Sequence, residues 1–217
     1  MKILFIRGFN TDNSPDIYAP FSTIFDTIEY FNYSPTKNLD NVYQKMCKMI
    51  KSKKYDIIMA HSMGGGLMMR YMYDNPEKIA QYKRIILLMP IVYKQTLNTI
   101  VSKIPFIDNV SIIKAVLLPA HLLYEGGNLL NDNFDLVSLQ QPIRMYNKYM
   151  LNDKDLVKTL NSHENCVLFY ATREAFNNID SKVLDKIKNK EFVTGKHQCF
   201  GENCNSVAFF KTLAKYL

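Results

Sequence analysis

One serine in the sequence stands between small residues in a pattern that is typical of nucleophilic chemistry. Ser62 has Ala60 two positions before it and Gly64 two positions after it, within the segment Ala-His-Ser-Met-Gly-Gly at 60–65. A serine hydroxyl is a weak nucleophile at neutral pH, so enzymes expose it on a sharp strand-to-helix turn, the nucleophile elbow, where a histidine can take its proton. Small residues are needed there because the strained turn brings backbones close together. The segment predicts such an elbow, with Ser62 as the nucleophile.

The elements around Ser62 fit this turn. The apolar run at 55–59 predicts a buried strand, and residues 63–73 predict the helix that leaves the elbow and is stopped by the proline at 76. A serine followed by glycines also occurs in phosphate-binding turns. The lysine of a P-loop is absent here, however, and no Gly-x-Gly-x-x-Gly pattern is present.

Apolar runs alternate with segments of helical periodicity along most of the chain, which predicts parallel strands joined by crossover helices. The expected strands are residues 3–6, 27–31, 55–59, 84–89, 166–170 and 191–194, and the expected helices are 39–52, 63–73, 181–190 and 207–217. A strand buried on both faces is continuously apolar, as the first of these runs is. We therefore predict an α/β fold with a doubly wound, mostly parallel sheet.

The alternation breaks between residues 91 and 165. A structureless loop of that length would be improbable in a compact domain, and apolar residues recur there at helical spacing. With 217 residues, the chain suits one α/β domain and an insertion. We predict a single domain over 1–217 with a helical cap at about 91–165.

The order of the remaining candidate residues leads to a known family. Glu174 comes three residues after the small residue Ala171, just past the strand expected at 166–170, and His197 comes two residues after Gly195, past the last expected strand. A nucleophile, an acid and a histidine in this order resemble the α/β-hydrolase family over nearly the whole chain. The resemblance implies a catalytic triad of Ser62, His197 and Glu174. Asp180 is the alternative acid, since Glu174 is one methylene longer than the more usual aspartate.

The same resemblance implies an oxyanion hole and an activity. Its donors would be the backbone N–H groups of Met63 and of Phe9, which lies in the loop after the first strand. Arg7 replaces the histidine that the family often has in this loop, and its charge would slightly favour a substrate with an anionic group. The implied reaction is hydrolysis of a carboxylic ester through an acyl-serine intermediate.

Several alternatives stay open at this stage. The same triad serves thioesterases and acyltransferases, and a binding protein can be built on the same scaffold without catalysis. The expected substrate is a small-molecule ester or acyl compound, with neither a metal nor an organic cofactor. Apolar segments at 104–107 and 116–119 suit an acyl chain, or simply form the core of the cap.

Other reactive residue types have ordinary explanations. Consecutive residues point apart, so His61 is expected to be a packed or hydrogen-bonded histidine and not the base. His121 and His163 are expected to have ordinary surface or core roles. The cysteines Cys47 and Cys166 lie far apart in the sequence, which predicts free thiols and a cytoplasmic location. Cys199 and Cys204 flank a glycine and could form a local bridge or a metal pair, but their spacing matches no zinc pattern.

Charge and hydropathy exclude further classes. The formal net charge is +7, but the lysines are spread along the chain and form no basic stripe interleaved with aromatic residues, so no nucleic-acid partner is expected. The dense lysines within 48–54 indicate a solvated helix end. The sequence contains no run of eighteen apolar residues, and we expect no secretory leader, because residues 3–6 already have the character of a strand. We expect no transmembrane segment, whereas contact with a membrane surface and the oligomeric state stay open.

Overall fold

The computed structural model describes residues 1–8, 18–25, 27–33, 39–92, 147–173, 179–195, 200 and 206–217. Within these residues, six strands form one sheet in the order β2-β1-β3-β4-β5-β6, and every neighbouring pair is parallel. This confirms the predicted parallel sheet. The strands are β1 (Ile3–Ile6), β2 (Ile28–Phe31), β3 (Ile57–His61), β4 (Arg84–Leu88), β5 (Cys166–Ala171) and β6 (Lys190–Val193).

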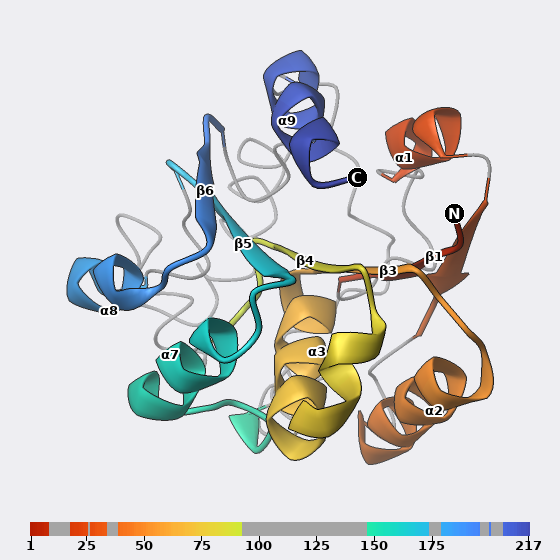
Figure 1. Ribbon diagram of the computed structural model, residues 1–217, viewed down its shortest axis with the longest axis horizontal. Coiled ribbons are helices and arrows are strands. Elements are labelled where there is room, and N and C mark those ends of the chain that lie inside the picture. Colours follow the sequence, from red (N-terminus) through yellow and green to blue (C-terminus); the bar gives the residue numbers. More distant parts are fainter. Residues whose placement is uncertain are drawn as a thin grey trace, which may run out of the picture.

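Helices cover both faces of this sheet (Figure 1). On one face lie α2 (Leu39–Ser52), α3 (Ser62–Asp74) and α7 (Asp153–Asn161), with α8 (Ser181–Lys186) beside α7. On the other face lie α1 (Ala19–Ile24) and α9 (Ser206–Leu213). Short 3₁₀ helices follow α3 and α9, namely η1 (Pro76–Gln81) and η2 (Ala214–Tyr216). The sheet is therefore doubly wound, as the alternation of apolar and helical segments predicts.

Successive side chains along a strand belong alternately to two separate hydrophobic cores, one on each face of the sheet. In β1, Leu4 and Ile6 belong to the core under α2, α3 and α7, whereas Ile3 and Phe5 belong to the core under α1 and α9. All four side chains are fully buried. Because successive side chains of a strand point to opposite faces, a strand covered on both sides must be apolar at every position. This is why the strands could be predicted from continuous apolar runs.

β3 begins two residues later than predicted. Its ladder with β1 starts where Ile57 lies opposite Ile3. The preceding residue, Asp56, instead accepts the backbone N–H of Lys2 on its carboxylate and donates its own N–H to the Lys2 carbonyl. The shift carries β3 through His61, so that Ser62 follows the last strand residue directly.

The described end of the predicted insertion belongs to the layer of crossover helices. α7 packs against α3 and β5, and it precedes β5 in the chain. Its N-cap is Asn152, whose side chain accepts the backbone N–H of Asp155. Residues 93–146, which make up most of the predicted cap, lie outside the described residues.

Two helices differ from the sequence prediction. The helix expected at 181–190 ends at Lys186, because Ile187 takes an extended conformation and the chain enters β6 at Lys190. The six-residue helix α1 was not predicted, because it is short and carries a proline in its first turn. Aromatic packing stabilises α1, since the Phe21 ring lies 4.8 Å from Phe5 and 5.1 Å from Phe200.

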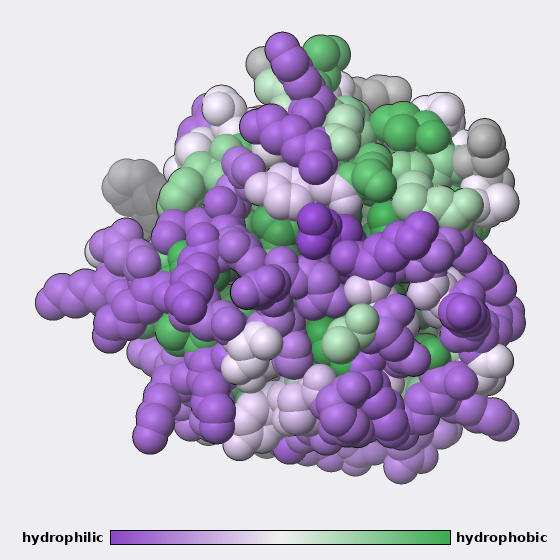
Figure 2. Space-filling view, viewed as in Figure 1, coloured by the Kyte–Doolittle hydropathy of each residue, from purple (hydrophilic) through white to green (hydrophobic). Residues whose placement is uncertain are grey.

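The surface in Figure 2 is mostly hydrophilic, and hydrophobic side chains gather around α1, to the right of α9. Ile24 of α1 and Val207 of α9 are among the exposed hydrophobic residues. In the part of the chain that the structure describes, no helix has the length and hydrophobicity needed to cross a membrane.

Candidate active site

Ser62 lies at the sharp turn between β3 and α3. It is the first residue of α3 and has a backbone φ of 53°. This left-handed region costs an L-amino acid roughly 1–2 kcal/mol and is uncommon outside glycine. The residue is buried, with 7% of its surface exposed. A serine held in such a conformation indicates a position where the fold stores strain.

The turn lies where the order of the sheet reverses. From β1 the chain moves outward to β2, and then returns to place β3 on the other side of β1. In open α/β sheets, ligands bind outside the carboxyl ends of the strands at such a switch point. Gly8 follows β1 and Ser62 follows β3, so both residues stand at this switch point.

The small residues after Ser62 are required by close backbone contacts. A Cβ atom added at Gly64 would lie 2.2 Å from the carbonyl oxygen of Arg7 and 2.7 Å from that of Ile6. A Cβ added at Gly65 would lie 2.7 Å from the Cβ of Pro90. The first turn of α3 therefore packs tightly against the end of β1 and against Pro90, two residues past β4, and alanine does not fit there.

We expect Gly64→Ala to destabilise the protein by about 1–3 kcal/mol or more, since the added methyl group would force the β1 backbone to move. In an open helix the same change stabilises by roughly 0.5–1 kcal/mol. The sign of the change in the free energy of unfolding, measured by urea denaturation, therefore shows whether Gly64 is tightly packed or lies in an open part of the helix. A stabilised Gly64→Ala protein would show that the contact with Arg7 does not exist.

The strain at Ser62 predicts an unusual order of stability. Both Ser62→Gly and Ser62→Ala remove the hydroxyl, but only glycine relieves the positive φ. The free energy of unfolding should therefore be about 1 kcal/mol higher for the glycine variant than for the alanine variant. Ser181 is the matched control, because it is also the first residue of a helix and has no positive φ. There, alanine should be at least as stable as glycine. The same order at both sites in urea denaturation would contradict the strained turn.

The loop after β4 holds the turn from the other side. The Ile91 backbone N–H donates to the Ser62 carbonyl over 2.9 Å. Met89, which follows β4, also has a positive φ, of 41°. Among the described residues, Ser62 and Met89 are the non-glycine residues with this conformation. Strained backbone is therefore found at the ends of two neighbouring central strands.

The loop after β1 passes directly beside Ser62. A Cβ added at Gly8 would lie 3.1 Å from the Cβ of Ser62 and 3.1 Å from Nδ1 of His61. The Gly8 N–H donates to the hydroxyl of Tyr18 over 2.9 Å. Phe9, the predicted second oxyanion donor, follows Gly8 and lies outside the described residues.

His61 is a packed histidine, as predicted. It is 2% exposed, and its Nδ1 lies 2.9 Å from the Tyr18 hydroxyl. Its ring meets the Phe200 ring edge to face at 4.9 Å between centroids. Tyr18 and Phe200 were not singled out from the sequence, because neither belongs to a motif and their contacts with His61 arise only when distant segments meet.

The chain segments that carry the predicted acid and base begin next to each other, after the neighbouring strands β5 and β6. The Thr172 N–H donates to the Val193 carbonyl, and the Arg173 N–H donates to the Gly195 carbonyl, each over 2.9 Å. Gly195 has a φ of 146°, which favours glycine at the turn after β6. Glu174 comes directly after Arg173 and His197 two residues after Gly195, and both lie outside the described residues.

Asp180, the alternative acid, caps a helix. Its carboxylate accepts the Lys182 N–H over 2.8 Å at the N-terminus of α8, and the residue is exposed. A carboxylate in this position satisfies an otherwise unpaired helix N–H group. The cap gives Asp180 a structural role.

Arg7 packs against aromatic rings beside the switch point. Its guanidinium carbon lies 5.0 Å from the centre of the Tyr18 ring and 4.5 Å from that of Tyr30. Such cation–π contacts stabilise a partly desolvated guanidinium. The positive charge that the sequence places next to Gly8 is thus held by two tyrosines.

The described cysteines are free and are unsuited to act as nucleophiles. Burial raises the pKa of the Cys166 thiol to about 12, and burial is also the main cause that raises the pKa of Cys47. A thiol with a raised pKa carries little of the reactive thiolate at neutral pH. Among the described residues, no group of histidine, cysteine and acidic side chains could hold a metal ion.

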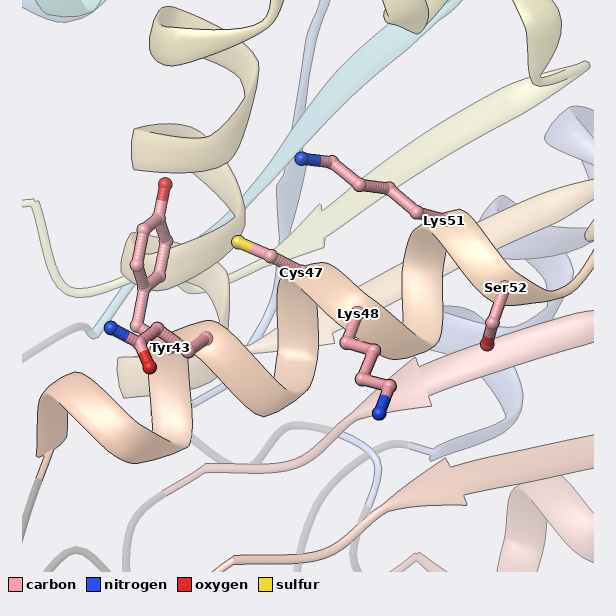
Figure 3. A pocket seen from close by; sticks show the side chains of 6 residues that line it. Tyr43, Cys47, Lys48, Lys51 and Ser52 are labelled. Carbon is pink, nitrogen blue, oxygen red and sulfur yellow. The ribbon is translucent and has the colours of Figure 1, made fainter.

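The surface of α2 carries a pocket (Figure 3). It is lined by Tyr43, Gln44, Cys47, Lys48, Lys51 and Ser52. Lys48 and Lys51 point to different sides of the helix, so their charges do not converge on one ligand. None of the predicted site residues lines this pocket.

Comparisons with known proteins identify the fold. No protein-family model matches the chain, and no curated protein matches it in sequence. The solved structures that are similar include a monoacylglycerol lipase of Paleococcus ferrophilus, at 11% identity and a TM-score of 0.58, covering 99% of this chain and 92% of that one. A meta-cleavage product hydrolase of Pseudomonas fluorescens IP01 matches at 14% identity and a TM-score of 0.57, over 100% and 90% of the two chains.

A lipase-esterase related protein of Clostridium acetobutylicum matches at 13% identity and a TM-score of 0.56, over 99% of this chain and 94% of that one. These neighbours, together with the parallel sheet and its flanking helices, show that the chain has the α/β-hydrolase fold. The predicted fold class and the predicted resemblance are thereby confirmed.

Proposed function

We propose that this protein is a serine hydrolase that cleaves a carboxylic ester through an acyl-serine intermediate. The observation that carries the proposal is the position of Ser62, which has a strained φ of 53° between β3 and α3 at the switch point of the sheet. Strain of this kind is retained where the surrounding structure enforces it, and it clusters at active sites. The names of the similar structures, which include lipases and an esterase relative, favour ester substrates.

His197 is the proposed base. Phe200, three residues later, contacts His61, the residue next to Ser62. Three residues of extended chain span at most about 11 Å, and Gly195 fixes the other side of the segment at the end of β6. The described residues on either side of His197 thus lie at the end of β6 and against His61, and this supports its assignment.

Glu174 is the proposed acid. It follows Arg173, whose N–H donates to the carbonyl of Gly195, so the two segments that carry the proposed acid and base begin at hydrogen-bonded residues. Asp180 already accepts the Lys182 N–H as a helix cap. We therefore prefer Glu174 over Asp180 as the residue that orients the His197 ring.

The proposed reaction has two halves. Ser62 Oγ attacks the ester carbonyl carbon while His197 takes its proton, and collapse of the tetrahedral intermediate expels the alcohol, which receives that proton. Water then attacks the acyl-serine with His197 again as the base, and the acid is released as Ser62 regains its proton. The negatively charged oxygen is stabilised by the N–H groups of Met63 and Phe9.

Both donor positions are consistent with the described backbone. Met63 lies in the first turn of α3, where N–H groups point out of the helix and the helix dipole favours negative charge. Phe9 follows Gly8, which lies against Ser62. We further propose that residues 93–146 form the cap over this edge and hold the acyl group. Because the described cysteines are free thiols, we also propose a cytoplasmic location.

The proposal is tested by measuring hydrolysis of nitrophenyl esters of increasing acyl length, beside a matched series of thioesters and anilides. We expect turnover of the esters, with a preference for one range of acyl length. If kcat/KM is higher for the thioester than for the matched ester at every acyl length, the protein would instead be a thioesterase. Absence of turnover in all three series would favour a binding protein on the same scaffold.

A further inference from the structure

A buried tyrosine hydroxyl connects the loop after β1 to the turn that carries Ser62. Tyr18 is fully buried, and its hydroxyl lies 2.9 Å from the Gly8 backbone nitrogen and 2.9 Å from Nδ1 of His61. Gly8 is the residue before the proposed donor Phe9, and His61 is the residue before the proposed nucleophile. One hydroxyl therefore links the two backbone segments that must act together.

The direction of these hydrogen bonds follows from their chemistry. The Gly8 N–H can only donate, so the Tyr18 oxygen accepts from it. The hydroxyl proton is then available to His61 Nδ1, which accepts it when the ring is neutral and protonated on Nε2. Buried groups linked in this way hold each other in one geometry, since breaking either bond leaves a buried polar atom unsatisfied.

We propose that Tyr18 is a positioning residue for the oxyanion hole. This inference rests on the proposed function. Because the Gly8 N–H already donates to Tyr18, the next N–H in this loop, that of Phe9, is the proposed donor to the oxyanion. The hydroxyl holds the peptide between Arg7 and Gly8 against His61, and the proposed donor belongs to the peptide that follows it in the chain. A donor displaced from the oxyanion loses much of its effect, because its stabilisation of the transition state depends on geometry.

The Tyr18 ring is held independently of its hydroxyl. It stacks on Phe200 at 5.7 Å, lies 5.0 Å from the Phe5 ring and carries the Arg7 guanidinium at 5.0 Å. Phenylalanine can keep these contacts, so Tyr18→Phe removes the hydrogen bonds and leaves the packing in place.

Tyr30→Phe is a matched control. The Tyr30 ring also lies against Arg7, at 4.5 Å, but its hydroxyl bonds to Ser22 Oγ and the Tyr18 carbonyl. The control therefore removes a tyrosine hydroxyl from the same cluster without touching Gly8 or His61.

We expect Tyr18→Phe to lower kcat by about 10- to 100-fold with KM within about twofold, because removing a whole oxyanion donor costs roughly 100- to 1000-fold. The affinity for an alkyl trifluoromethyl ketone, whose adduct carries an oxyanion, should fall by the same factor. The affinity for the product acid should not change, and Tyr30→Phe should behave as wild type. Unchanged kcat and ketone affinity in folded Tyr18→Phe would overturn the inference, as would a loss confined to KM.

A second pair of variants decides the matter if Tyr18→Phe does not fold. His61→Leu removes the acceptor for the Tyr18 hydroxyl, whereas the side-chain oxygen of His61→Asn can take the place of Nδ1. We expect a loss of kcat in the leucine variant that asparagine restores, and equal kcat values would overturn the inference. If the wild type reacts with a fluorophosphonate but Tyr18→Phe has an unchanged kcat, only this inference is refuted and the proposed function stands. A wild type without that reaction would refute the proposed function.

Discussion

Replacing Ser62 or His197 by alanine is expected to lower ester turnover by about four to six orders of magnitude. Without Ser62 no acyl intermediate can form, and without His197 the hydroxyl keeps its proton and remains a weak nucleophile. Because the two residues act in one step, the double variant should lose little more than either single variant. Initial rates with the best nitrophenyl ester, at equal concentrations of folded protein, measure the effect.

His163→Ala is the control for these variants. His163 lies in the turn before β5, where its carbonyl accepts the Cys166 N–H, and burial lowers the pKa of its imidazole. It has no place in the proposed mechanism, so its alanine variant should retain wild-type turnover. Comparable turnover in folded Ser62→Ala would contradict an acyl-serine mechanism, and loss of turnover in His163→Ala would mean that the base has been misassigned.

Changing Glu174 to glutamine should lower turnover by about 10⁴-fold, whereas Asp180→Asn should leave turnover near that of wild type. A glutamine beside His197 can hold the ring in the wrong tautomer, so that the nitrogen facing Ser62 can no longer accept a proton. Asparagine caps helices about as well as aspartate does, so α8 should remain intact in Asp180→Asn. The measurement is kcat/KM for both variants with the same ester.

The stability of the two amide variants provides the control. Thermal unfolding should show both to be folded, and Asp180→Ala should cost about 1 kcal/mol through loss of the cap. A large loss of turnover in Asp180→Asn with none in Glu174→Gln would reverse the assignment of the acid. Small, equal losses in both would mean that neither carboxylate orients His197.

Much of the sheet could be predicted because its strands are covered on both faces. Burial on both sides requires continuous apolar runs, and these are visible in the sequence at β1, β4 and β5. The turn at Ser62 could be predicted because its close backbone contacts require small residues. The Arg7 carbonyl oxygen, for example, leaves no room for a Cβ atom at Gly64. In both cases the structural requirement, burial of a strand or close packing of a turn, restricts the residue types of one short segment and is therefore visible in the sequence.

Features that depend on contacts between distant segments could not be predicted. The Tyr18 hydroxyl bonds to partners 10 and 43 residues away, and no sequence pattern marks a tyrosine for such a role. The start of β3 depends on how Asp56 pairs with Lys2, 54 residues earlier in the chain. Helix α1 is held by aromatic contacts of Phe21 with β1 and with Phe200, and it lacks the length that makes a helix recognisable.

The most direct test of the central claim is the intact mass of the protein after treatment with an alkyl fluorophosphonate. This reagent forms a stable bond with a serine hydroxyl only where a base and an oxyanion hole activate it. We predict one adduct on the wild type and none on Ser62→Ala, with His163→Ala labelled like the wild type. An adduct of the same yield on Ser62→Ala, or no adduct on folded wild type, would contradict the account of Ser62 as an activated nucleophile.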